Sequence, residues 1–118
     1  MANPVVHFEV MATKGTGDAV RKFYADAFGW KVDANNPMRY GLVDNGGQGI
    51  NGGIGEPMEG GAYVTFYVQV DDLAKALDHI ESIGGTRVMP PMDVPGGGVS
   101  IAMFKDPAGN LVGLVKNA

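Results

Sequence analysis

Residues 5–11 alternate between apolar side chains and a second set that includes a histidine and a glutamate. A period of two predicts a strand, because successive side chains of a strand point to opposite faces. One face carries His7, Glu9 and Met11, and the other carries Val6, Phe8 and Val10. We expect the apolar face to pack against a helix and the polar face to lie toward solvent or a cavity.

Apolar residues of the next stretch recur with the three- and four-residue spacing of a helix. They are Val20, Phe23, Tyr24, Ala27 and Phe28. We expect these side chains to form the buried face of a helix that Thr16 or Asp18 caps and Gly29 ends.

Three short apolar runs follow the helix and predict strands. They cover residues 30–32, 38–44 and 48–54, and the last run is rich in glycine. Asn45-Gly46 lies between the second and third runs and predicts a hairpin turn.

The second half of the chain repeats this order. A strand is predicted at residues 62–70, and a helix at 73–83 that Asp71 or Asp72 caps. A strand at 86–89 follows, after which Pro90-Pro91 is expected to begin a loop.

The last two predicted strands form a hairpin around Asp106-Pro107-Ala108-Gly109. Asp106 suits the first position of a type I turn, Pro107 the second and Gly109 the fourth. Apolar runs enter and leave this turn, at residues 99–104 and 111–115.

Each half therefore predicts one βαβββ unit, and Phe28-Gly29 and Ile83-Gly84 mark equivalent helix ends. The expected fold class is α+β, in one domain over residues 1–118 with modules at 3–58 and 62–118. One module cannot bury its sheet face alone. Two modules paired through their sheets would form a curved, partly open eight-stranded sheet or barrel.

Three motifs resemble those of the vicinal oxygen chelate superfamily, which includes glyoxalases, bleomycin-resistance proteins and extradiol dioxygenases. They are Phe23-Tyr24-Ala25-Asp26-Ala27-Phe28-Gly29-Trp30, Val70-Asp71-Asp72-Leu73 and Asp106-Pro107-Ala108-Gly109-Asn110-Leu111-Val112-Gly113-Leu114. Residues 88–98 make the chain similar to small glyoxalase-like members. The resemblance implies the paired βαβββ fold, a homodimer, and sites at or near the pairing of modules.

The resemblance also locates the positions at which the metalloenzymes of this superfamily hold a metal. These positions fall on His7, on Thr65, on Gly113 and within residues 51–54. Of these, only His7 offers an imidazole or a carboxylate. We therefore expect the fold without the usual metal site, and no cofactor.

His7 and Glu9 are candidate catalytic residues. A histidine in a cleft could act as a ligand or general base, and a buried carboxylate with a raised pKa could act as a base. The alternatives are structural: His7 could be satisfied by a neighbour such as Glu9. Glu9 could itself accept bonds from the backbone, Arg39 or Arg87.

Tyr63, Thr65 and Tyr67 share one face of their predicted strand and could form an amphipathic wall for a small organic ligand. The same face could instead meet the partner module or a second subunit. Met103 could add adaptable apolar lining. Gly113, inside the last strand, would allow close approach of a ligand or of backbone.

Composition narrows the function further. A net charge of −4 leaves no basic stripe for nucleic acid, and the absence of cysteine excludes disulfides, thiolate catalysis and cysteine-bound metals. Without a charged-then-apolar leader or an apolar run of membrane-spanning length, we expect a cytoplasmic protein with no membrane partner.

Three functions remain open. The first is a protein that binds a small organic molecule in the cleft between modules without the usual metal. The second is a glyoxalase-like lyase or isomerase that uses His7 and Glu9, with or without a metal. The third is a structural or interaction module whose cleft is filled by its own side chains.

Overall fold

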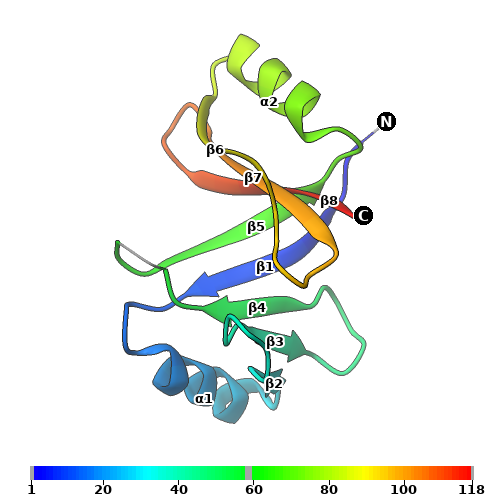
Figure 1. The fold of residues 1–118 in the computed structure, drawn as a ribbon. Helices are drawn as coiled ribbons and strands as arrows, with labels where there is room; N and C mark the ends of the chain where they lie inside the picture. Colours follow the sequence, from blue (N-terminus) through cyan, green and yellow to red (C-terminus); the bar gives the residue numbers. More distant parts are fainter. Residues whose placement is uncertain (1, 58–59, 118) are drawn as a thin grey trace. The chain divides into compact units, whose positions relative to one another are not determined.

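The computed structural model describes residues 2–57 and 60–117, and within them it contains eight strands and two helices (Figure 1). The elements are β1 (Val5–Met11), α1 (Gly17–Phe28), β2 (Lys31–Asp33), β3 (Gly41–Asp44), β4 (Gly52–Gly55), β5 (Tyr63–Gln69), α2 (Leu73–Ser82), β6 (Thr86–Asp93), β7 (Val99–Lys105) and β8 (Leu111–Asn117). The predicted α+β class and the repeated βαβββ order are confirmed.

The chain forms two compact units, which we name by their place in the sequence. The N-terminal unit comprises residues 7–65, and the C-terminal unit comprises residues 66–117 together with 2–6. The chain passes from one unit to the other inside β1 and again inside β5. The module boundaries at 3–58 and 62–118 stay predictions, and residues 58 and 118 lie outside the described residues.

In the N-terminal unit the strands follow the order β2-β3-β4-β1. The β1–β4 pair is parallel and the other two pairs are antiparallel. In the β1–β4 pair, Glu9 lies opposite Gly53. The hairpin predicted at Asn45-Gly46 is present, but its loop covers residues 45–51, because Asn45 and Asn51 bond the backbone inside it.

The predicted buried face of α1 is partly wrong. Phe23 and Phe28 are 63% and 62% exposed, whereas Arg21 is only 8% exposed. The Arg21 guanidinium bonds Asp18 and the carbonyl of Arg39, and the absence of a side chain at Gly41 leaves room for its stem. A charged side chain can be buried where hydrogen bonds and an ion pair satisfy it.

The start of α1 is capped from a distant part of the chain. Thr16 occupies the N-cap position, but its side chain makes no cap bond. The Glu56 carboxylate instead accepts the backbone N–H groups of Gly15 and Gly17, at 2.6 and 3.0 Å. A carboxylate is favoured here because the first N–H groups of a helix lack partners and carry partial positive charge.

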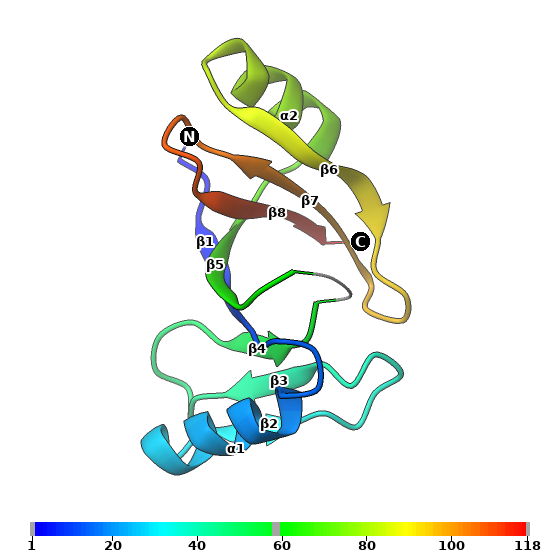
Figure 2. The same cartoon turned by 90° about the vertical axis from the view of Figure 1, so that its left-hand side faces the viewer.

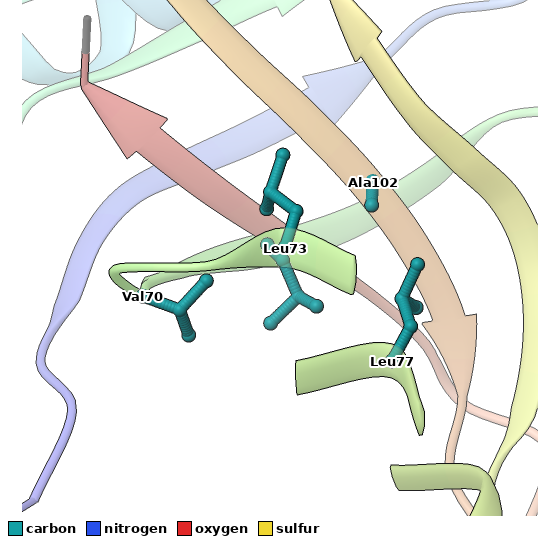
Figure 3. Close-up of a cluster of buried hydrophobic side chains, with 5 residues drawn as sticks. Val70, Leu73, Leu77 and Ala102 are labelled. Carbon is teal, nitrogen blue, oxygen red and sulfur yellow. The ribbon is translucent and has the colours of Figure 1, made fainter. Parts of the chain in front are cut away.

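In the C-terminal unit the strands follow the order β5-β8-β7-β6, and α2 lies along one face of this sheet (Figure 2). Asp72 caps α2 as predicted, by accepting the Lys75 N–H. The core consists of the buried residues Val70, Leu73, Leu77, Ala102 and Leu114 (Figure 3). Leu77 is fully buried, so the apolar stripe of α2 faces the sheet.

The strand β6 is longer than predicted. It extends through Pro90-Pro91 to Asp93, where we expected a loop. It is the last strand in the order, and its pairing with β7 shifts register between Met89 and Met92. Proline is tolerated in an edge strand and at irregularities because its missing N–H is not needed there.

The hairpin between β7 and β8 is as predicted. Gly109 donates its N–H to the Asp106 carbonyl at 2.9 Å and has a φ of +93°, which glycine adopts without strain. The Asp106 side chain accepts the N–H groups of Ala108 and Asn110.

No helix among residues 2–57 and 60–117 is long and apolar enough to cross a membrane. The cytoplasmic location stays a prediction.

We expect Glu56→Gln to destabilise the protein by about 1–2 kcal/mol, because the start of α1 loses its charged acceptor. Amide hydrogen exchange at Gly15 and Gly17 should accelerate, and urea unfolding should give the loss of stability. The matched control is Glu81→Gln, since Glu81 bonds the side chain of Arg87 on the surface. Equal effects of the two substitutions would contradict the capping role.

Candidate functional site

A hydrogen-bonded chain of three side chains lies in the N-terminal unit. The Tyr40 hydroxyl donates to Glu9 Oε2 at 2.9 Å, and it lies 2.9 Å from His7 Nε2. The hydroxyl has one proton, so His7 must donate through Nε2–H. Glu9 is only 7% exposed, and burial lowers the pKa of His7 below its usual value. The site therefore combines an imidazole whose pKa is lowered by burial with an oriented carboxylate.

Local backbone geometry positions Tyr40 immediately before β3. Asn36 bonds both the N–H and the carbonyl of Tyr40, at 2.9 and 2.7 Å. The preceding residue, Arg39, has a φ of +52°, an uncommon conformation outside glycine. The chain therefore makes a fixed turn that brings the Tyr40 side chain to β1.

Gly53 provides the space that the Tyr40 ring occupies. A Cβ atom at residue 53 would overlap the ring and hydroxyl of Tyr40. Because Gly53 pairs with Glu9, this space lies directly beside the carboxylate. The glycine is required by the close approach of a ring, one of the usual reasons for glycine inside a strand.

The predicted site residues fall into two groups, one in each unit. In the N-terminal unit, Tyr63 and Thr65 accompany His7 and Glu9. Thr65 is buried. Burial and the charge of Glu9 raise the pKa of Tyr63, because both disfavour the phenolate. Tyr63 thus lies within the electrostatic field of Glu9.

The second group comprises Tyr67, Met103 and Gly113 of the C-terminal unit. Gly113 pairs with Tyr67 on β5 and with Met103 on β7, so the structure brings these three residues together. Tyr67 and Met103 are buried, and a Cβ at residue 113 would overlap the Tyr67 ring. Gly113 is therefore approached closely by a side chain of its own unit.

A groove of about 540 Å³ lies between α1 and the ends of β1 and β5 in the N-terminal unit. Its lining is mainly apolar and includes Val10, Val20, Phe23 and Val64. Of the predicted site residues, only Tyr63 lines it. The volume is in the range of small-molecule sites.

The sequence did not identify Tyr40 as a site residue. The structural alternatives named backbone, Arg39 or Arg87 as partners of Glu9, and a neighbour such as Glu9 as the partner of His7. The structure inserts the Tyr40 hydroxyl between His7 and Glu9. A signal was present in the glycines at 52–53, which indicate a close approach, but they do not say by which side chain.

Comparison with known proteins decides the family. Residues 6–114 match the model of the Glyoxalase/Bleomycin resistance protein/Dioxygenase superfamily. The chain belongs to this superfamily. The "Probable lactoylglutathione lyase" of Vibrio cholerae is 30% identical to it over 120 residues, which cover 91% of this chain and 87% of the relative.

Solved structures of the superfamily fold agree. Methylmalonyl-CoA epimerase from Mycobacterium tuberculosis is 17% identical, with a TM-score of 0.69 over 97% of this chain and 87% of that one. A superfamily member from Vibrio splendidus is 15% identical, with a TM-score of 0.64 over 98% of this chain and 100% of that one. At these identities the likeness shows the fold alone.

The donor set does not fit the metal centre of the superfamily's metalloenzymes. Gly53 pairs with Glu9 in β1 and β4 as Gly113 pairs with Tyr67 in β5 and β8, so the two glycines are equivalent positions of the repeat. A tyrosine ring covers each of them. Within the described ranges, no group of three or more histidine or acidic side chains could hold a metal ion.

We expect Gly113→Ala to destabilise the protein by about 1–3 kcal/mol, because the added methyl group must displace the Tyr67 ring. Urea unfolding should measure this cost. Gly61→Ala is the matched control, since nothing lies within 4 Å of a Cβ built there and its φ is not positive. A Gly113→Ala variant as stable as Gly61→Ala would show that the ring moves freely.

Proposed function

We propose that this superfamily member binds a small organic molecule at the His7–Tyr40–Glu9 site without a metal ion. The observation that carries the proposal is the hydroxyl of Tyr40 bonded to both His7 and Glu9. It supports an organic ligand because imidazole, phenol and carboxylate groups can orient polar atoms while aromatic walls such as Tyr63 cover apolar surface.

The environment of residue 53 supports the metal-free part of the proposal. A carboxylate at this position would need the space of the Tyr40 ring. A cation held by side chains normally needs three or more ligands, and His7 with Glu9 supplies two. The homodimer and the location between modules stay predictions from the family resemblance.

Metal-independent binding predicts a rise in melting temperature with an organic probe in the presence of EDTA, since a ligand that binds the native state stabilises it. The probes are lactoylglutathione, named for the Vibrio cholerae relative, and a panel of small carbonyl compounds. His7→Ala should abolish the shift, whereas His79→Ala, at an exposed histidine of α2, should retain it. Stabilisation by Zn²⁺, Ni²⁺ or Mn²⁺ that EDTA reverses would contradict the metal-free site.

A second candidate function is lyase or isomerase activity. It is favoured by the 30% identity to a relative named as a lactoylglutathione lyase, and by an imidazole and a carboxylate joined by one hydroxyl. Together these groups could remove and return a proton in general acid–base catalysis.

Lyase activity predicts that lactoylglutathione forms from the hemithioacetal of glutathione and the matching 2-oxoaldehyde, with a gain of thioester absorbance, because the thioester is the more stable side of this equilibrium. Glu9→Gln should lower the rate by about 100-fold or more, the usual contribution of a general acid–base group. Glu81→Gln is the control for loss of one negative charge. Tight binding of lactoylglutathione without turnover would favour the binding function over the enzyme.

A further inference from the structure

We propose that Tyr40 is the positioning residue of the His7–Glu9 site, and that its hydroxyl joins the two groups in space where the superfamily's metalloenzymes carry a ligand. The role of this arrangement in ligand binding rests on the proposed function. The arrangement itself rests on contacts within the N-terminal unit alone.

The hydrogen bonds of Tyr40 run from His7 through its hydroxyl to Glu9. Tyr40 has one proton, which it donates to Glu9, so it accepts the Nε2–H of His7. His7 is thereby held in the tautomer protonated at Nε2, and Glu9 is held as an acceptor. A hydrogen bond of one ring nitrogen is the usual way in which proteins fix a histidine.

The Tyr40 ring occupies the space beside Gly53. Register makes Gly53 the counterpart of Gly113 in the repeat. The family resemblance implies a metal-ligand position at Gly113. In the N-terminal unit the Tyr40 ring covers the equivalent position. A side chain at residue 53 and the Tyr40 ring would occupy the same space, so the presence of one excludes the other.

The Tyr40 ring is held independently of its hydroxyl. Asn36 fixes the backbone of Tyr40 on both sides of its side chain, and the ring packs against the β4 backbone at Gly53 and Gly55. Removal of the hydroxyl alone should therefore leave the ring in place. The positioning role and a purely structural role of the ring can be separated by experiment.

The decisive variant is Tyr40→Phe, measured by the exchange rate of the His7 Nε2–H proton in ¹⁵N-labelled protein. We expect a resolved, slowly exchanging resonance in the unsubstituted protein, and exchange about tenfold faster in Tyr40→Phe. His79, which is exposed, gives the reference for a ring without protection. Tyr24→Phe removes the hydroxyl of an α1 residue that stacks on Trp30, and it should leave the His7 signal unchanged.

Gly53→Ala tests the same role with the hydroxyl still present. The added methyl group should displace the Tyr40 ring and accelerate the His7 exchange as Tyr40→Phe does, and the double variant should exchange no faster than Tyr40→Phe. Gly61→Ala controls for an added methyl group. Backbone amide spectra serve as the control for folding of each variant.

The proposal is overturned if the His7 resonance is unprotected in the unsubstituted protein, or if Tyr40→Phe exchanges within about twofold of it. This readout needs no ligand. If lactoylglutathione and the carbonyl panel fail to bind while Tyr40→Phe releases His7, the proposed function fails and the role of Tyr40 stands. If a probe binds and His7 exchange is unchanged in Tyr40→Phe, the proposed function stands and the positioning role of Tyr40 fails.

Discussion

The parallel pairing of β1 with β4 places the buried carboxylate of Glu9 opposite a residue without a side chain. The polar site of the N-terminal unit depends on this register. A shift by one residue would place Ile54 or Gly52 opposite Glu9, and the Tyr40 ring would lose its place on the strand. Because side chains alternate across a strand, such a shift would also move Glu9 to the other face of the sheet.

The two units carry the same feature with different chemistry. In each, a tyrosine ring covers a glycine, Gly53 of β4 or Gly113 of β8, but Tyr67 comes from the strand paired with its glycine, whereas Tyr40 lies immediately before β3. In the N-terminal unit the ring brings its hydroxyl between a histidine and a carboxylate. A duplicated frame has thus kept its backbone pattern while its side chains diverged.

Most of the fold could be predicted from the sequence, because strand and helix periods, the Asp72 cap and the turn at Asp106 are local signals. His7 and Glu9 followed from the same alternation. Tyr40 could not be predicted, since its role depends on the β1–β4 register and on a backbone turn at Arg39. The cap from Glu56 and the strand through Pro90-Pro91 were missed for the same reason: partners distant in sequence and the place at the sheet edge decide them.

The chain crosses between the units inside strands rather than in the linker that separates the repeats. The Gln69 N–H bonds the Pro4 carbonyl, so the C-terminal unit includes the first residues of the chain. Cutting the chain between the repeats would therefore separate residues 2–6 from the rest of the C-terminal unit. These residues would stay attached to the first repeat. The sequence repeat and the compact unit are therefore offset. New chain ends in a split or permuted gene are better placed in the exposed loop at 45–51, where they interrupt no strand.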